Sequence, residues 1–237
     1  MHCRVATLAD LGAIMKVEEE TFGELGMDAM ASRALMESRI LLCNTFQPGW
    51  FWVTEMNEQV TGYIVLQPTH LLPESCVSWE SSTDNGSLLS TYAEDGETIF
   101  GVSIATGKCA PPGTGNILLH QMALLWLKTK KKRFMFCSRL PGFEQAHVAS
   151  GVSATAYWKQ TDESGVPVDW LLREFYDELG VLPKRFLPNG FLPDKQSGGH
   201  GALVVVDDPF LALQLLVTRI YDAGIKQGIQ SSKGSSK

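Results

Sequence analysis

Apolar and polar positions in the N-terminal third of the chain follow the periods of strands and helices in turn. The pattern predicts a strand, two helices and a two-stranded hairpin, over residues 2–6, 8–22, 28–42, 50–56 and 59–66. Thr7 and Asp10 have the spacing of a capping box, which marks the start of the first helix. Glu18, Glu19 and Glu20 crowd its end, where they face either a cationic amine substrate or water.

The middle of the chain reads strand, glycine loop, helix and strand, over residues 98–105, 110–116, 117–128 and 134–137. Gly113 and Gly115 stand where the loop enters the helix. The first turn of a helix presents unpaired backbone N–H groups and the positive end of the helix dipole, so such a loop favours binding of a pyrophosphate. The alternative is an ordinary strand-to-helix turn, in which glycine is present for steric reasons.

The C-terminal part of the chain predicts an amphipathic helix over 170–181, capped by Gly180, and strands over 185–191 and 202–206. A further helix begins near Pro209, and the tail 227–237 has too little apolar surface to fold. Two stretches are polar and irregular enough to be insertions, 67–97 and 143–168. The sequence therefore predicts one α/β domain over 1–226, followed by a flexible tail or linker.

Composition narrows the class of protein. The 237 residues are 44% hydrophobic and 19% charged, which suits a globular domain with a substantial core, and the net charge of −6 disfavours a nucleic-acid surface. No apolar run approaches the length of a membrane span and no signal peptide is evident, so we expect a cytoplasmic protein. The cysteines lack metal-ligand spacing, so we expect reduced thiols and no metal site: Cys3, Cys43, Cys76, Cys109 and Cys137.

The glycine loop and the helix over 170–181 together resemble the GNAT (GCN5-related N-acetyltransferase) superfamily. Its acyl-CoA loop reads Gln or Arg, two residues, Gly, one residue, then Gly or Ala; Gly113 and Gly115 match, and Ala110 replaces the Gln or Arg. The stretch Phe175-Tyr-Asp-Glu-Leu-Gly180 is similar to the end of the family's fourth helix. The resemblance covers about residues 3–206 outside the two insertions. It implies a divergent member with a mixed, mostly antiparallel central sheet flanked by helices.

The resemblance also implies a site for acetyl-CoA or another acyl-CoA. Tyr176 falls on the position of the tyrosine that protonates the departing thiolate. Glu97 is a candidate general base, and a water chain would serve equally. Ser138 or Arg139 stands where the family often has an asparagine that contacts the cofactor. The residues expected to bind the cofactor are Ile104, Ala105, Ala110, Pro111, Pro112, Gly113, Thr114, Gly115, Asn116, Ser138 and Arg139.

The function implied by this resemblance is acetyl transfer from acetyl-CoA to an amine by direct attack. One alternative is the branch that serves polyketide synthase loading modules and decarboxylates malonyl- or methylmalonyl-thioesters; it carries a histidine near the position of Tyr176, which is absent here. Another is an inactive domain that binds CoA or a partner protein, which Ala110 favours. The acceptor is a small molecule or a carrier-bound group, and the linker-like tail fits a segment of a larger multidomain protein.

Overall fold

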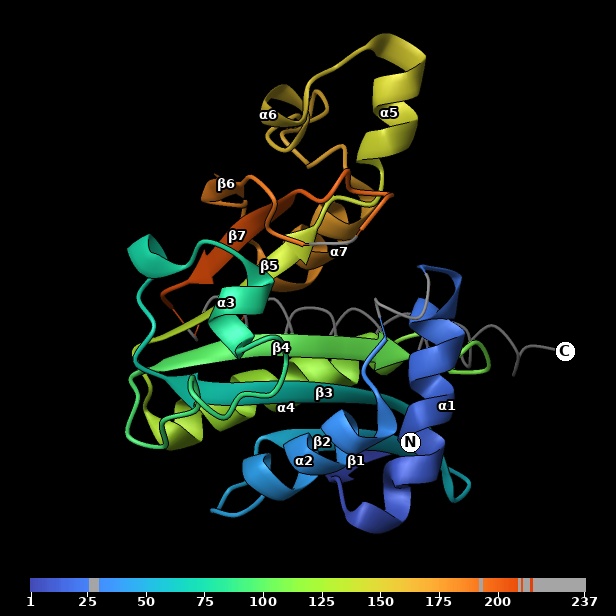
Figure 1. Cartoon of the computed structure of the whole chain (residues 1–237), viewed down its shortest axis with the longest axis vertical. Helices are drawn as coiled ribbons and strands as arrows, with labels where there is room; N and C mark the ends of the chain where they lie inside the picture. The colour runs from blue at the N-terminus through green and yellow to red at the C-terminus, as the bar shows by residue number, and fades with distance from the viewer. Residues whose placement is uncertain (26–29, 192–193, 209, 211–213, 215–237) are drawn as a thin grey trace, which may run out of the picture.

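A seven-stranded sheet forms the centre of the molecule. The computed structural model describes residues 1–25, 30–191, 194–208, 210 and 214. The strands run in the spatial order β1-β2-β3-β4-β5-β7-β6 (Figure 1), and only the β4–β5 pair is parallel. Their bounds are His2–Val5 (β1), Phe51–Met56 (β2), Gln59–Thr69 (β3), Thr98–Thr106 (β4), Arg133–Arg139 (β5), Arg185–Leu187 (β6) and Gly201–Val206 (β7). This is the mixed, mostly antiparallel sheet that the sequence predicted.

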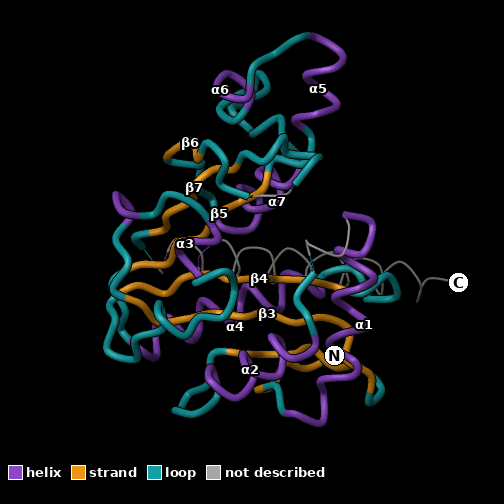
Figure 2. The backbone as a smooth tube through the Cα atoms, in the orientation of Figure 1, coloured by secondary structure: helices purple, strands orange, loops and turns teal. Residues whose placement is uncertain are grey.

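Helices cover both faces of the sheet (Figure 2). In the view of Figure 1, α2 and α3 lie in front of the strands, and α4 and α7 lie behind them. The α-helices are Leu11–Phe22 (α1), Arg33–Cys43 (α2), Trp79–Thr83 (α3), Thr114–Thr129 (α4), Phe143–Ser150 (α5), Ala154–Tyr157 (α6) and Trp170–Leu179 (α7). Short 3₁₀ turns occupy Leu8–Asp10 (η1), Gly23–Leu25 (η2) and Pro73–Ser75 (η4). None of the described helices is long and apolar enough to cross a membrane.

The two central parallel strands pair over only part of their length. Thr98–Gly101 of β4 pairs with Arg133–Phe136 of β5, and β5 then continues beside β7 up to Arg139. Figure 1 shows β5 turning away from β4 toward the C-terminal ends of both strands. On its other edge β4 carries a bulge, because Val65 pairs with Ser103 while Leu66 pairs with Gly101. The sheet is therefore open between β4 and β5.

The 67–97 insertion is folded onto the sheet. Its first residues extend β3, since Thr69 pairs with Thr98. Its α-helix, α3, is fixed to β4 by the Trp79 indole N–H, which donates to the Val102 carbonyl at 2.7 Å. The segment is therefore more ordered than its polar, irregular sequence predicted.

The 143–168 insertion contains α5 and α6, which project from the sheet at the top of Figure 1. Asp169 anchors it: this carboxylate accepts hydrogen bonds from the Gly142 amide at 3.0 Å and the Tyr157 hydroxyl at 3.1 Å, and it caps α7. The helix predicted after Pro209 and the tail 227–237 lie outside the described residues, apart from Phe210 and Gln214.

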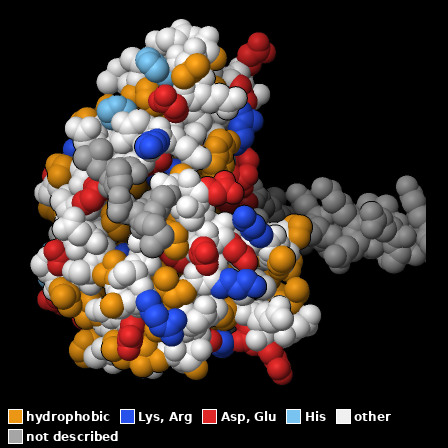
Figure 3. All heavy atoms as spheres, turned by 45° about the vertical axis from the view of Figure 1, so that its right-hand side comes forward, with side chains coloured by type: hydrophobic (Ala, Val, Ile, Leu, Met, Phe, Trp, Pro, Cys, Tyr) orange, Lys and Arg blue, Asp and Glu red, His pale blue; other side chains and the backbone are white. Residues whose placement is uncertain are grey.

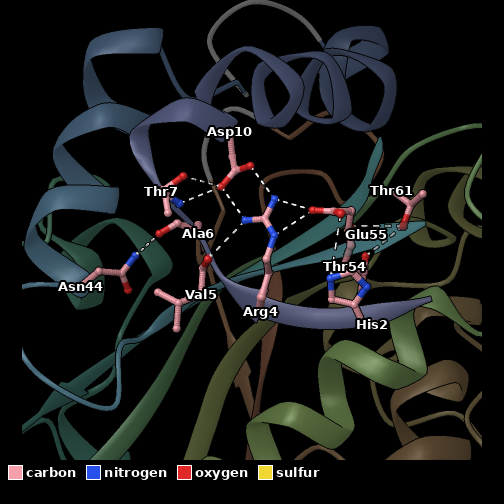
Figure 4. Close-up of polar contacts among 10 residues, drawn as sticks. All are labelled: His2, Arg4, Val5, Ala6, Thr7, Asp10, Asn44, Thr54, Glu55 and Thr61. Carbon is pink, nitrogen blue, oxygen red and sulfur yellow. Dashed lines mark hydrogen bonds and ion pairs between the residues drawn. The ribbon is translucent and has the colours of Figure 1, made fainter. Parts of the chain in front are cut away.

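The first helical segment is fixed to β1 by a partly buried ion pair (Figure 4). Asp10 accepts from the Arg4 guanidinium at 2.7 and 2.8 Å and from the Thr7 backbone N–H at 2.8 Å, as the capping-box spacing predicted.

The surface charge is mixed. On the face drawn in Figure 3, acidic and basic side chains lie near one another with hydrophobic ones between them.

Candidate functional site

The glycine loop enters α4 in the geometry that the sequence predicted. Gly113 is the N-cap residue with φ of +86°, a conformation that favours glycine, and its carbonyl accepts the Ile117 N–H at 3.1 Å. The Thr114 hydroxyl donates to the Pro111 carbonyl at 2.7 Å and closes the turn. Among the described residues, a Cβ atom on Gly113 would meet no heavy atom within 4 Å, and one on Gly115 would meet only Thr106 Cγ2 at 4.0 Å. The first turn of α4 is thus open to a ligand.

A cavity of about 450 Å³ lies where β4 and β5 separate. The two strands supply its centre, with Gly101, Val102, Ser103 and Ile104 from β4 and Phe136, Cys137, Ser138 and Arg139 from β5. Residues behind the sheet also line it, Leu119 of α4 and Phe175 of α7, and so do residues in front of it, such as Phe22 and Trp79. The cavity therefore passes through the opening in the sheet, and most of its wall is aromatic or aliphatic.

Glu18 is a buried carboxylate on this wall. It is 3% exposed, and its two oxygens accept hydrogen bonds from the Ala31 N–H at 2.7 Å and from the Tyr63 hydroxyl. Burial, followed by the neighbouring Glu18 carboxylate, raises the pKa of Tyr63 well above its ordinary value, so the phenol stays protonated and donates. The sequence left open whether the run Glu18 to Glu20 faces a substrate or water. Glu18 is the one of the three that lines the cavity. Glu19 is exposed, and Glu20 accepts the Lys108 N–H at 2.9 Å.

Ser138 and Arg139 line the cavity, but their side chains already have partners. The Arg139 guanidinium donates to Asp194 at 2.6 and 2.9 Å and to Gln196 at 3.0 Å, and the buried Ser138 hydroxyl donates to the Arg139 carbonyl at 2.9 Å. Burial opposes ionisation of Asp194, but the hydrogen bonds from Arg139 and Ser197 hold its pKa below the ordinary value. This charged pair fixes the end of β5 to the loop before β7.

Four other residues predicted to bind the cofactor differ in their position and in the contacts of their side chains. Ile104 lines the cavity, whereas Ala105 is buried beside it. The Asn116 amide donates to Glu178 at 3.0 Å, which ties α4 to α7. In the loop itself, Ala110 is half-buried and contributes no polar side chain, so contacts with a ligand must come from the backbone.

The structure does not bring the two predicted catalytic residues together. Tyr176 is half-buried on α7, where its neighbour Phe175, and not Tyr176, lines the cavity. Glu97 is exposed at the N-terminal end of β4, on a separate small pocket with His70. An ion pair with Lys132 at 2.7 Å lowers the pKa of Glu97, which makes this carboxylate a weaker base.

Two buried thiols lie in contact beside the cavity. Cys76 Sγ, from the 67–97 insertion, is 3.5 Å from Cys137 Sγ, and Cys137 lines the cavity. Among the described residues, no three His, Cys, Asp or Glu side chains are grouped as metal ligands would be.

Sequence reasoning missed two of the polar or aromatic residues that shape this wall, Arg39 and Trp79. Arg39 had a signal that could have found it. It falls on the face of α2 formed by Met36, Ile40 and Cys43, where a buried apolar side chain is the rule. No local pattern points to Trp79, because its place follows from its contact with β4.

Comparison with known proteins identifies the fold. The loading GNATL domain of CurA from Lyngbya majuscula superposes with a TM-score of 0.73 at 18% identity, over 87% of this chain and 96% of that one. The GphF GNAT-like decarboxylase in complex with isobutyryl-CoA superposes with a TM-score of 0.70 at 18% identity, over 87% of this chain and 99% of that one. The ribosomal-protein-alanine N-acetyltransferase from Brucella melitensis superposes with a TM-score of 0.54 at 13% identity, over 88% of this chain and 100% of that one. No family model and no curated protein sequence matches the chain. The chain has the predicted fold.

Proposed function

We propose that this GNAT-fold chain is an acyl-CoA-dependent acyltransferase that moves an acetyl group from acetyl-CoA to an amine. The observation that carries the proposal is the cavity through the sheet at the split between β4 and β5, with the open glycine turn of α4 following the same strand. The loop would take the pyrophosphate on its backbone N–H groups, and the split would take the thioester arm. Both the opening and the loop fit a long, phosphorylated ligand.

Each end of the cavity suits one half of the reaction. The pairing of β4 with β5 ends at Gly101, and from there on this edge of β4 has no strand partner in the described structure. A backbone N–H near Ile104 or Ala105 would therefore be available to polarise the thioester carbonyl.

On the α1 side, the Glu18 carboxylate would attract an ammonium group into a cavity whose wall is mostly aromatic or aliphatic. The ammonium must first lose a proton through a water chain, because the attacking amine must be neutral. As the C–N bond forms and the C–S bond breaks, Tyr176, the neighbour on α7 of the cavity residue Phe175, would protonate the leaving thiolate of CoA and would regain a proton from the acylated nitrogen through water.

The loop is tested by placing negative charge where the pyrophosphate would lie. Gly113→Asp with Gly115→Asp should weaken acetyl-CoA binding at least about 100-fold in titration calorimetry, because like charges repel in this backbone cradle. Gly151→Asp with Gly165→Asp is a matched control, since both glycines have positive φ and open space around Cβ, outside the site. Unchanged affinity in a folded loop variant would disprove the proposed site.

Decarboxylation of a malonyl-type thioester is the second candidate function. It is favoured by the comparison, in which the loading domain and the GNAT-like decarboxylase reach TM-scores of 0.73 and 0.70 while the alanine N-acetyltransferase reaches 0.54. Both reactions would use the same thioester cavity. They differ in whether an acceptor is needed, which is the basis of the experiment described in the Discussion.

A further inference from the structure

Arg39 is a buried arginine with unused hydrogen-bonding capacity on the cavity wall. It is 2% exposed and lines the cavity from α2. Its Nε donates to the Gly86 carbonyl at 2.7 Å, which is its only hydrogen bond within the described residues. A guanidinium carries five N–H groups, so the four on its two terminal nitrogens remain. Glu18, the carboxylate on the same wall, forms no ion pair with it within 4.0 Å.

Such a group is costly unless something pairs with it. A buried charge without hydrogen-bonding partners loses its hydration without compensation, and natural proteins pair or neutralise these groups. Burial lowers the pKa of Arg39, while the nearby Tyr63 and Glu18 act in the opposite direction. Packing alone does not explain the arginine, because a methionine would fill the same apolar face of α2 beside Met36 and Ile40.

We infer that Arg39 binds a carboxylate carried by a substrate inside the cavity. Its planar fork of N–H groups matches a carboxylate in two parallel hydrogen bonds, which a neutral donor could not replace. The inference rests on the proposed function, since the ligand would occupy the same thioester cavity. In acetyl transfer the carboxylate is carried by the amine, whose ammonium Glu18 would then face. On a malonyl-type thioester, the substrate of the second candidate function, it is carried by the acyl group.

Matched ligand pairs on the wild-type chain distinguish the two sources. The thioester pair is malonyl-CoA against acetyl-CoA; the acceptor pairs are amino acids against the amines that lack only the carboxylate, titrated with CoA present. One of these comparisons should favour the carboxylated member about tenfold or more, as expected of a charge-assisted hydrogen bond. A tenfold preference among thioesters assigns the carboxylate to the acyl group, and one among amines assigns it to the acceptor. No preference in either comparison overturns the inference.

Variants then connect the preference to the residue. Arg39→Gln should abolish the preference and change affinity for the neutral member less than about threefold, whereas Arg39→Lys should keep part of it. Arg33→Gln, exposed on the same helix, is the control. A full preference in a folded Arg39→Gln chain overturns the inference. If that variant fails to fold, a preference in Arg39→Lys as large as that of the wild type overturns it, because a lysine cannot form the paired bonds.

A readout without CoA separates this inference from the proposed function. Malonate should raise the Tm of the wild type and of Arg33→Gln, but not that of Arg39→Gln. A malonate effect that depends on Arg39 without any acetyl-CoA binding would keep the carboxylate site and reject the acyltransferase. Acetyl-CoA binding with no carboxylate preference and no malonate effect would reject the carboxylate site and leave the acyltransferase proposal standing.

Discussion

Asp10 is a nearly buried carboxylate with a full set of partners, and its charge contributes to stability. The Arg4 guanidinium lowers the pKa of Asp10 to about 2, with burial acting in the opposite direction and Thr7 assisting (Figure 4). Asp10→Asn keeps the shape and removes the charge. We expect it to reduce the free energy of unfolding by about 1–2 kcal/mol at pH 7, measured by urea denaturation.

The pH dependence gives the sign of this effect. Because the pKa of Asp10 is lower in the folded chain than in the unfolded one, its contribution is present above about pH 4 and is lost as pH falls toward 2. The stability difference between wild type and Asp10→Asn should therefore shrink between about pH 5 and pH 2. Arg33→Gln is the control, since Arg33 is exposed on α2 and an arginine does not titrate in this range. A difference that stays constant down to pH 2 would contradict the assignment.

Tyr176 is the residue on which the acid step of the proposed transfer depends. Tyr176→Phe should lower kcat roughly 10²- to 10⁴-fold with little change in acyl-CoA affinity, because only the phenolic hydroxyl, the proton donor, is removed. Turnover is followed as free thiol released from acetyl-CoA with an amine acceptor present. Tyr157→Phe removes a hydroxyl bonded to Asp169, outside the cavity, and should leave kcat unchanged. Full turnover in Tyr176→Phe would mean that the ring only packs.

At the scale of elements, local signals predicted the main helices and strands. The Asn57-Glu58 turn between β2 and β3 and the Gly180 cap of α7 both follow from turn and cap chemistry, and all three residues have positive φ. Such signals work because they depend on neighbours in the chain. The loop-to-helix start was placed three residues late, at Ile117, because Gly113 already caps the helix.

The observed ends of β3 and α2 differ from the predicted ones, because contacts outside the local apolar pattern decide them. β3 extends past Leu66 to Thr69 because Thr98 of β4 pairs with it. The second helix was predicted from residue 28, but it begins at Arg33, since Ser32 caps it through the Leu35 N–H at 3.2 Å. The Ala31 N–H is bound by Glu18 of α1 instead of entering the helix. The Ser32 cap is a local signal that the prediction overlooked, whereas Thr98 and Glu18 cannot be identified as partners from local periodicity.

At the scale of the whole molecule, the candidate site could be predicted only in its local part. The glycine loop and the end of β5 followed from motif positions, and Ile104, Ser138 and Arg139 do line the cavity. The four-residue pairing of β4 with β5, which creates the opening, is a property of the assembled sheet. The same holds for the wall, which gathers Glu18, Arg39 and Trp79 from segments far apart in sequence.

The fate of a thioester without an acceptor separates the candidate functions. The purified chain is incubated with acetyl-CoA, malonyl-CoA and methylmalonyl-CoA, and the products are followed by mass spectrometry. An acetyltransferase leaves acetyl-CoA intact apart from slow hydrolysis. A decarboxylase takes up a proton and releases CO₂, which converts malonyl-CoA to acetyl-CoA and methylmalonyl-CoA to propionyl-CoA. An inactive domain binds without either change, even when amines are added.

We expect no loss of CO₂. Decarboxylation passes through an enolate whose oxyanion needs fixed donors at the thioester carbonyl. Arg139 and Ser138 already donate to Asp194 and to a backbone carbonyl. The histidine that the sequence resemblance implies for the decarboxylating branch is absent, because Tyr176 stands near that position. The Ser103 hydroxyl is the exception, since it is buried near the Tyr63 hydroxyl without a hydrogen bond of normal geometry in the described structure. Release of CO₂ from malonyl-CoA that Ser103→Ala, Arg139→Gln or Tyr176→Phe abolishes would therefore overturn the transferase and establish the decarboxylase.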